Sequence, residues 1–576
     1  MALIGGSYST TDARPGDYDP GVSERALTVE AHIPDALSGQ VQERLALARE
    51  AKVGERVRAG DATLWAPEGT PEVADRLGWL TITERMLAGL GALELFAAQV
   101  HDDEIEDIVL LGMGGSSLAP EVLRRSFAGT VSEPPPSPRM HVLDSTDAAR
   151  IRAVEAALDL RRTLFIVSSK SGGTIEPLSL FAYFFSLVDH GSSFVAITDP
   201  GSGLEELASR HAFRRTFAGD PNIGGRYSAL SAFGVVPGAL MAIRVRLLLE
   251  GAPQAWETPL DDGSGEPATE GAGVWLGAAL SALARAGRDK LTFVISETLP
   301  GLGLWLEQLV AESTGKHATG ILPVADEPLG EPGSYGEDRV FAYLPDSSAP
   351  DPALDARAQA LVDAGHPLIT MPTRGPVDLG RVFLLWELAV AVAGWGLEIN
   401  PFDQPNVQQA KDATKHVLAD YEAKRELPQV ADADAATLRS LLLDAQPPQY
   451  VAIMAYCEPS PEFDEAAGEL RVAIRAATKA TTTFGYGPRF LHSTGQFHKG
   501  GPKTGRFLQL IHDGPQDVDI PGAPYTFTTL KNAQAIGDLN TLRELGLPAE
   551  RVRLTGDDPV SALRALTAQI KEQTNT

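Results

Sequence analysis

Residues 107–120 read DIVLLGMGGSSLAP, and this stretch decides the expected fold. Its first six residues form an apolar run of strand length, and a turn rich in glycine and serine then leads into a helix-like segment. A strand that is apolar throughout is typical of a parallel sheet covered on both faces. The stretch therefore predicts one strand–turn–helix unit of an α/β protein.

The same pattern recurs along the chain. Short apolar runs of β character alternate with longer helix-like segments, as βαβ units do. Further runs of this kind begin at Arg139, Thr163, Ser193, Leu291, Val340, Leu368, Pro448, Thr481 and Arg506. Their order predicts several parallel-sheet units, one after another.

We expect four regions. Two doubly wound parallel-sheet domains are predicted at residues 86–256 and 257–425, and the polar stretch ETPLDDGSGEPATEGAG opens the second of them. A polar, helical segment at 1–85 precedes them, and an α/β region at 426–576 follows them. The predicted class is α/β with two doubly wound parallel sheets.

The net charge of the chain limits which classes of partner it can bind. The chain has 576 residues, 43% of them hydrophobic, and a formal net charge of −27. So acidic a surface repels nucleic acid and anionic membranes, so neither is an expected partner. It also repels anionic substrates, so any phosphate site must be built locally from backbone N–H groups and a few placed cations.

The chain is expected to be cytoplasmic. It has one cysteine, Cys457, which excludes an intramolecular disulfide and suits a reducing compartment. Its start lacks the basic and apolar regions of a signal peptide. The longest apolar run, at 382–397, contains Glu387 and is too short for a membrane span, so it predicts a buried helix.

A second glycine-rich turn, SSKSGGTIEP, starts at Ser168. It gathers hydroxyls, one lysine and two glycines where a strand should end and a helix begin, and ligands of open parallel sheets bind at that edge. A phosphate monoester suits such donors, and a helix N-terminus favours an anion. We interpret the turn as a phosphate site, and a capped strand-to-helix turn is the alternative.

The first turn, GMGGSSL, is not a dinucleotide-binding fingerprint, because Ser117 stands where G-x-G-x-x-G has its third glycine. Its glycines still allow a ligand to approach the backbone closely. The chain also lacks the nucleotide-binding pattern G-x-x-x-x-G-K-[ST]. A small phosphorylated molecule is therefore a better candidate ligand than a nucleotide.

Three further segments carry candidate catalytic side chains. GGRYSALSAFG places Arg226 after two glycines, LEQLVAESTGK sets Gln308 and Glu312 four apart, and FDQPNVQQAK sets Gln404 and Lys411 seven apart. On a helix, these spacings place Gln308 on the same face as Glu312, and Gln404 on the same face as Lys411. The helix of the second segment should end at the glycine of ESTGK. Singly, each residue also fits an ordinary surface or structural role.

Together, these segments resemble the phosphoglucose isomerase family. GGRYSALSAFG and FDQPNVQQAK match two family signatures, and ESTGK is similar to the stretch around the family's catalytic glutamate. SSKSGGTIE and GMGGSSL are similar to its sugar-phosphate loop and preceding glycine turn. The motifs follow the family's order from Leu111 to Lys411. The resemblance implies two sugar-isomerase domains, a small sugar-phosphate substrate, and neither a metal nor a cofactor.

The resemblance also implies an activity: interconversion of glucose 6-phosphate and fructose 6-phosphate through a cis-enediolate, in glycolysis and gluconeogenesis. Glu312 would move the proton between C1 and C2, Arg226 would stabilise the enediolate, and Lys411 would assist ring opening. The residues implied to bind the phosphate or the sugar are Gly115, Ser116, Ser169, Lys170, Ser171, Thr174, Glu176, Gly225, Gln308 and Gln404.

The family's ring-opening histidine usually lies between the glutamate and lysine motifs, in a Gly-Gln-His segment. Between those motifs this chain has only His317 and His366, neither in such a segment. The C-terminal stretch LHSTGQFHKGG looks like the missing segment, an arrangement similar to the isomerase half of transaldolase–phosphoglucose isomerase fusions. It offers two catalytic candidates, His498 and His492.

Conventional family members are homodimers whose histidine comes from the partner subunit. A C-terminal histidine segment could act within its own chain, so a homodimer and a monomer both stay open. Two functional alternatives also remain. One is a non-catalytic sugar-phosphate sensor, which does not need Glu312, Arg226 and Lys411 together. The other is an isomerase that also accepts mannose 6-phosphate.

Overall fold

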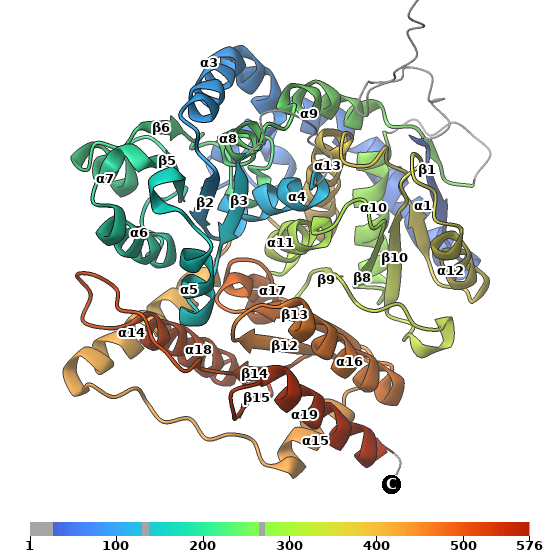
Figure 1. Ribbon diagram of the computed structural model, residues 1–576. Helices are drawn as coiled ribbons and strands as arrows, with labels where there is room; N and C mark the ends of the chain where they lie inside the picture. The colour runs from blue at the N-terminus through green and yellow to red at the C-terminus, as the bar shows by residue number, and fades with distance from the viewer. Residues whose placement is uncertain (1–26, 129–137, 264–270, 575–576) are drawn as a thin grey trace, which may run out of the picture.

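The computed structural model of the chain describes residues 27–128, 138–263 and 271–574. In these ranges the chain forms three β-sheets flanked by helices (Figure 1). The predicted α/β class with doubly wound parallel sheets is confirmed. The chain's start and part of the polar stretch at 257–273 lie outside the described residues.

The first sheet has five parallel strands in the order β3-β2-β4-β5-β6. Strands β2, β4 and β5 are buried along their whole length, which explains their continuous apolar runs. The strands are β2 (Asp107–Gly112), β3 (Arg139–Leu143), β4 (Thr163–Ser168), β5 (Phe194–Thr198) and β6 (Arg215–Ala218).

The topology of this sheet places the two predicted ligand turns together. From β2 the chain passes to β3 on one side and then returns to β4 on the other, so the order reverses between β2 and β4. Gly112 is paired in register with Ser168, so the turns after these strands lie side by side. Ligands of doubly wound sheets bind at such a switch point. The helices of this region are α3 (Ile82–Asp102), α4 (Leu118–Ser126), α5 (Ala148–Ala156), α6 (Ile175–Val188), α7 (Gly203–Arg210), α8 (Ala232–Leu240) and α9 (Val245–Gly251).

The second sheet has six strands in the order β7-β1-β11-β10-β8-β9. Strand β1 (Val29–His32) comes from the N-terminal segment, for which we expected only helix, and it runs antiparallel to β11. It is four residues long and its burial alternates, so it gave only a weak signal. The other strands are β7 (Leu260–Asp261), β8 (Lys290–Ile295), β9 (Leu322–Val324), β10 (Arg339–Leu344) and β11 (Leu368–Thr370).

The apolar run at 382–397 lies in α13 (Leu379–Leu397), a buried helix as predicted. Among the residues the structure describes, no helix combines the length and apolarity needed to cross a membrane. The other helices of the N-terminal segment and the second domain are α1 (Asp35–Glu50), α2 (Val53–Arg58), α10 (Ala272–Arg285), α11 (Leu302–Thr314), α12 (Pro352–Asp363) and α14 (Val407–Lys424).

The C-terminal region has its own four-stranded parallel sheet, in the order β13-β12-β14-β15. The strands that we predicted from Pro448, Thr481 and Arg506 are present as β12, β13 and β14. The elements are α15 (Ala435–Leu443), β12 (Tyr450–Tyr456), α16 (Pro461–Thr478), β13 (Thr481–Tyr486), α17 (Gly495–Gly500), β14 (Gly505–Ile511), α18 (Phe527–Glu544), β15 (Ala549–Arg553) and α19 (Pro559–Thr574).

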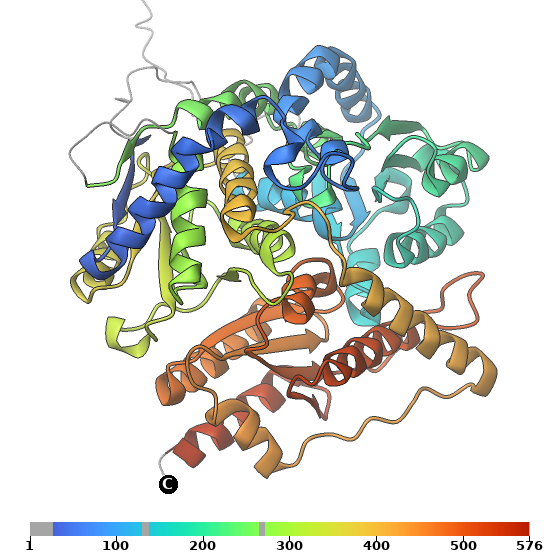
Figure 2. The same cartoon turned by 180° about the vertical axis from the view of Figure 1, so that it is seen from behind.

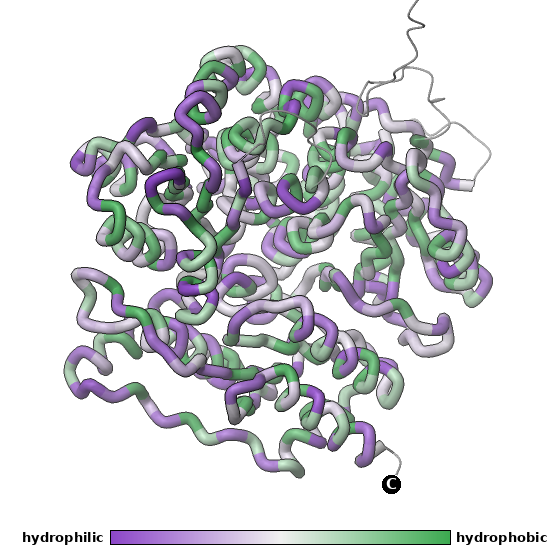
Figure 3. Tube along the Cα trace, viewed as in Figure 1, coloured by the Kyte–Doolittle hydropathy of each residue, from purple (hydrophilic) through white to green (hydrophobic). Residues whose placement is uncertain are grey.

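The C-terminal region shares its core with the first domain. Apolar residues of α18, including Phe527 and Ile536, belong to the same buried cluster as Phe165 and Val167 of β4. Figure 2 shows α14 lying along α18, and Figure 3 shows hydrophobic residues on helical coils as well as on the extended segments between them. Burial of a large apolar side chain contributes about 1.5–3 kcal/mol, so this shared core holds the C-terminal region in a fixed position.

The contact between α18 and α14 predicts a stability effect. A Cβ at Gly537 of α18 would lie 2.9 Å from the backbone nitrogen of Thr414 in α14. We expect Gly537→Ala to lower the free energy of unfolding by about 1–3 kcal/mol, because backbone atoms yield little. Gly39→Ala in α1 is the matched control: its Cβ would meet nothing within 4 Å, so it should raise stability by up to about 1 kcal/mol. Urea unfolding measures both, and equal effects would contradict the close helix contact.

Candidate active site

Two glycine turns meet backbone to backbone at the centre of the site. They are the short helices η5 (Gly114–Ser116) and η8 (Gly225–Tyr227). A Cβ at Gly115 would lie 2.0 Å from the carbonyl oxygen of Gly225, so a larger residue cannot stand there. The Ser228 hydroxyl also donates to the carbonyl of Gly115 at 3.3 Å. The first glycine turn and the GGRY segment therefore form one unit.

Arg226 is buried, with 1% of its surface exposed. Its Nε donates to Ser313 Oγ at 2.8 Å and its Nη1 to Gln404 Oε1 at 2.8 Å. Its Nη2 donates to the backbone carbonyls of Pro401 and Asp403 at 2.7 and 2.8 Å. A guanidinium has five N–H donors in a rigid plane, so these four bonds fix its position.

Glu312 lies beside this guanidinium. It is buried in the last turn of α11, and its Oε2 is 3.6 Å from Arg226 Nη1. Gln308, one helical turn earlier, donates from Nε2 to the same oxygen at 3.1 Å. The prediction that both share one helix face, and that the helix ends before Gly315, is confirmed. Gln308 Oε1 is buried without a hydrogen-bond partner among the described residues, so it can accept from a ligand hydroxyl.

His492 joins this cluster from the C-terminal region, at the end of η11 (Arg489–His492). Its backbone carbonyl accepts a hydrogen bond from Gln308 Nε2 at 2.8 Å, and its Nε2 is 3.0 Å from Glu176 Oε1. Gly114, at a φ of +52°, leaves room for it, because a Cβ there would lie 2.9 Å from the His492 carbonyl. The structure thus brings His492, Glu176, Gln308 and Glu312 together.

Electrostatics keep Glu176 ionised. Burial by itself raises the pKa of this carboxyl, but the charge and hydrogen bond of His492, with the charge of Lys411, hold the pKa below its ordinary value. Lys411 is exposed on α14. The charges of His492 and Lys411 therefore act on Glu176, and the Gln308 amide joins His492 to Glu312.

The predicted phosphate turn leads into α6, with Thr174 at the N-cap position but without a side-chain capping bond. Ser169 Oγ and Thr174 Oγ1 are 2.9 Å apart, while Ser171 and Gly173 are exposed. A Cβ at Gly173 would meet nothing within 4 Å, so this backbone faces open space. Ser116 is buried in the neighbouring turn after β2. Hydroxyls, backbone N–H groups and the N-terminus of a 14-residue helix thus meet at the switch point.

Lys170 has partners within its own domain. Its ammonium is paired with Asp199 and donates to the carbonyl of Asp220 at 2.8 Å. Burial lowers the pKa of Lys170, and Asp199 opposes that effect. The lysine therefore ties its turn to the residues that follow β5 and β6, and Asp199 partly neutralises its charge.

These contacts can be set against known proteins. A model of the family described as phosphoglucose isomerase matches residues 95–338. The glucose-6-phosphate isomerase of Rubrobacter xylanophilus is 30% identical over 368 residues, which are 55% of this chain and 84% of that protein. The chain belongs to the phosphoglucose isomerase family. It is accordingly an aldose–ketose isomerase that acts on a sugar phosphate.

Two solved structures resemble the fold of this chain. A protein of Thermus thermophilus described as hypothetical has a TM-score of 0.56 and 26% identity, over 68% of this chain and 100% of that one. A glucose-6-phosphate isomerase of Chlamydia trachomatis has a TM-score of 0.50 at 19% identity, over 68% of this chain and 86% of that one. The second likeness concerns the fold alone.

In this family member the other histidine candidate, His498, lies elsewhere. Its ring packs against Tyr450 and Phe507, and its Nδ1 is 2.9 Å from the Tyr450 hydroxyl. Burial lowers the pKa of His498 to about 3. Tyr450 is the first residue of β12, whereas Tyr456, which senses the Glu176 charge, is the last. His498 therefore lies near the start of β12, and the Glu176–His492 pair lies near its end.

The sequence also misplaced Gln404, which we expected on the same helix face as Lys411. Helix α14 begins only at Val407, so Gln404 lies in the preceding loop and contacts Arg226 instead. Pro405 explains the difference, because the residue before a proline is disfavoured in helical conformation.

Several contributors were not predicted. Ser313 and Lys316 lie within the ESTGK motif, and Lys316 Nζ binds Asp403 Oδ1 at 2.6 Å, which holds the 400–404 loop. Burial, then the charge of Arg226, lowers the pKa of Lys316 to about 7. Gln534 of α18 contacts Glu176 at 2.7 Å, and nothing in its local sequence indicated this. Ser313 and Lys316 could have been predicted as site residues, because the ESTGK motif that contains them was already identified.

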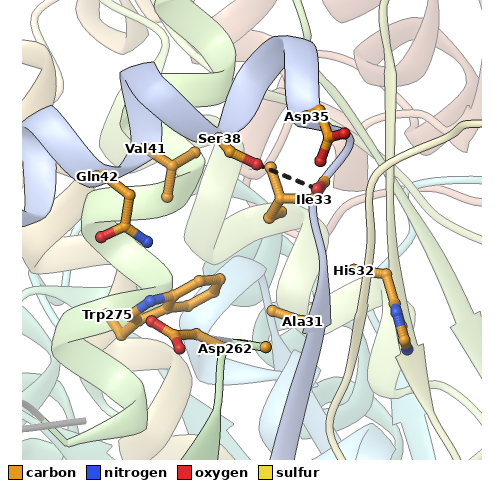
Figure 4. A pocket seen from close by; sticks show the side chains of 10 residues that line it. Ala31, His32, Ile33, Asp35, Ser38, Val41, Gln42, Asp262 and Trp275 are labelled. Carbon is orange, nitrogen blue, oxygen red and sulfur yellow. Dashed lines mark hydrogen bonds between the residues drawn. The ribbon is translucent and has the colours of Figure 1, made fainter. Parts of the chain in front are cut away.

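Two further observations concern metal binding and a second pocket. Among the described residues, no group of three or more His, Cys, Asp or Glu side chains is arranged to hold a metal ion. A separate pocket of about 280 Å³ lies between β1, α1 and α10, where Ser38 Oγ donates to the Ile33 carbonyl at 3.3 Å (Figure 4). Its lining includes the carboxylates of Asp35 and Asp262, which disfavour a phosphorylated ligand.

The lowered pKa of Glu176 predicts a pH-dependent stability. Because the folded-state pKa lies below its ordinary value of about 4.3, ionised Glu176 stabilises the fold above about pH 5. This contribution is lost as the pH falls through the lowered folded-state pKa. The difference in unfolding free energy between wild type and Glu176→Gln should therefore be present above about pH 5 and shrink below about pH 4. Urea unfolding at a series of pH values measures it, and a constant difference would contradict the ion pair.

Proposed function

We propose that the enzyme interconverts glucose 6-phosphate and fructose 6-phosphate through a cis-enediolate, a step of glycolysis and gluconeogenesis. One observation carries the proposal: the buried carboxylate of Glu312 lies 3.6 Å from the fixed guanidinium of Arg226. A proton transfer next to a carbonyl needs such a base, and the resulting oxyanion needs such a cation.

Glu312 is the proposed base that carries a proton between C2 of the aldose and C1 of the ketose. Its Oε2 accepts from Gln308, which orients the carboxylate without neutralising it. A positioned general base contributes about 10²–10⁴ in rate. The unpartnered Oε1 of Gln308 is free to accept from a substrate hydroxyl beside the reacting carbons.

Arg226 is the proposed stabiliser of the enediolate, together with the backbone of Gly225. Four hydrogen bonds hold the guanidinium in place before substrate arrives. Because no reorganisation is then needed as negative charge develops, the cation acts fully in the transition state. The Gly225 backbone is accessible, since a Cβ there would meet nothing within 4 Å.

Ring opening is assigned to His492, with Glu176 and Lys411. The ring oxygen must receive a proton and a hydroxyl must lose one, and an imidazole serves both tasks near neutral pH. In the neutral ring, the hydrogen bond from Nε2 to Glu176 leaves Nδ1 as the acceptor. The 3.0 Å contact supports His492 over His498, whose ring is enclosed by aromatic side chains.

The phosphate group is proposed to bind at the switch point of the first sheet. Ser116, the hydroxyls of Ser169, Ser171 and Thr174, and the N-terminus of α6 supply the donors. Lys170 adds a cation that Asp199 shares.

We also propose that one chain carries a complete site. His492 contacts Glu176 and Gln308 of its own chain, so the ring-opening histidine needs no second subunit. Turnover should therefore persist at enzyme concentrations where sedimentation shows monomers. Activity confined to dimers would contradict this part of the proposal.

Replacement of the base tests the reaction. Glu312→Gln should lower kcat for fructose 6-phosphate by about 10²–10⁴-fold, because Gln cannot accept the proton. Glu307→Gln on the same helix is the control: burial raises the pKa of Glu307 to about 8, so this carboxyl is mostly protonated at pH 7 and Gln resembles it. A coupled assay measures both, and circular dichroism checks the fold. Near-normal kcat in Glu312→Gln would remove Glu312 from the mechanism.

The same assay with mannose 6-phosphate tests the substrate range at C2. Phosphosugar-dependent thermal stabilisation without turnover would instead favour a binding protein.

The two histidines make a second test. His492→Asn should lower kcat for fructose 6-phosphate by about 10²-fold or more, and it should also lower the unfolding midpoint because buried Glu176 loses a partner. His498→Asn should lower the free energy of unfolding by about 1–3 kcal/mol, because it disturbs a buried hydrogen bond to Tyr450. Its kcat at a temperature where it is folded should stay near normal. The reverse pattern would return the ring-opening role to His498.

A further inference from the structure

Helix α18 presents a buried polar stripe to the rest of the molecule. Lys531, Gln534 and Asp538 follow one another at spacings of three and four residues, hence on one helix face. They are 1%, 3% and 1% exposed. Burial of polar groups is unfavourable unless each finds a partner, so the partners of this stripe indicate what it does.

The two ends of the stripe anchor α18. Lys531 Nζ binds Asp147 Oδ2 at 2.8 Å, and Asp147 caps α5 in the first domain. Asp538 Oδ1 is 2.6 Å from Nζ of Lys499 in α17, the helix that follows His492. One helix therefore fixes both the first domain and the histidine segment.

Gln534, in the middle of the stripe, contacts the proposed ring-opening pair. Its Nε2 donates to Glu176 Oε1 at 2.7 Å, the same oxygen that lies 3.0 Å from His492 Nε2. Its Oε1 accepts from the Thr146 hydroxyl at 3.0 Å. Because each end of the amide has a fixed partner, its orientation is determined, and the N–H side must face the carboxylate.

We infer that Gln534 is a positioning residue for ring opening: it holds the Glu176 carboxylate so that His492 keeps one ring orientation and one tautomer. The inference rests on the ring-opening role proposed for His492. Outer partners of a hydrogen-bonded carboxylate–histidine pair commonly set the orientation of the imidazole in this way.

The chemistry of an amide suits this task. A lysine at position 534 would pair with Glu176 and weaken its attraction for His492, whereas a neutral amide donates without cancelling the negative charge. A carboxylate there would repel Glu176. Glutamine therefore fixes the position of the Glu176 carboxylate, while the full negative charge of that carboxylate still acts on His492.

The test separates ring opening from proton transfer by the choice of substrate. Fructose 6-phosphate must open before it reacts, whereas 5-deoxyfructose 6-phosphate lacks the hydroxyl that closes the ring and needs no opening. We expect Gln534→Met to lower kcat for fructose 6-phosphate by about 10- to 100-fold. The turnover of the open-chain analogue should change less than about 2-fold, because Glu312 and Arg226 are untouched.

Two variants complete the design. Asn540→Met, at an exposed position of the same helix, is the matched control and should leave both substrates unaffected. Thr146→Val removes only the donor to Gln534 Oε1, so it tests the same chain of contacts if Gln534→Met fails to fold. Thr146→Val should also lower kcat for fructose 6-phosphate selectively, by a smaller factor. Circular dichroism checks the fold.

The outcomes are distinct. A selective loss on fructose 6-phosphate supports the positioning role. Equal losses on both substrates, or no loss on either, would overturn it and leave Gln534 a structural residue. A wild-type enzyme that turns over the open-chain analogue but not fructose 6-phosphate would overturn the ring-opening proposal, and this inference with it.

Discussion

The burial of one guanidinium organises the active site. Arg226 has almost no exposed surface, and a buried cation is tolerated only where its donors are paired. Its hydrogen bonds reach the end of α11 and the loop at 400–404, so they connect the first domain to two parts of the second. The backbone contact between Gly115 and Gly225 then brings the first glycine turn to the same point. Glu312 is held beside the cation as a consequence.

Gln308 links the two chemical steps. One amide nitrogen donates to Glu312 at 3.1 Å and to the backbone of His492 at 2.8 Å. The proposed base and the proposed ring-opening residue thus have a common support, although they belong to different regions of the chain. Shared supports of this kind make the effects of substitutions non-additive, since a shift at one residue moves the other.

The sequence predicted what local patterns control. Continuous apolar runs identified buried strands, and the spacing of Gln308 and Glu312 gave their shared helix face. Contacts between distant segments left no local signal. His492 and His498 stand six residues apart in one glycine-containing segment, yet His492 contacts Glu176 whereas His498 contacts Tyr450 at the start of β12. Gln534 lies 358 positions from its partner Glu176, and no spacing rule covers such a pair.

The stripe on α18 also bears on the order in which the molecule is made. The glycine turns, the base, Lys411 and His492 all precede α18 in the chain, so the ribosome produces them first. Domains commonly begin to fold during synthesis, at about 5–20 residues per second, with the N-terminal parts ahead. Glu176 therefore lacks Gln534, and Asp147 lacks Lys531, until this helix emerges. The contacts that complete the proposed active site therefore form only late in synthesis.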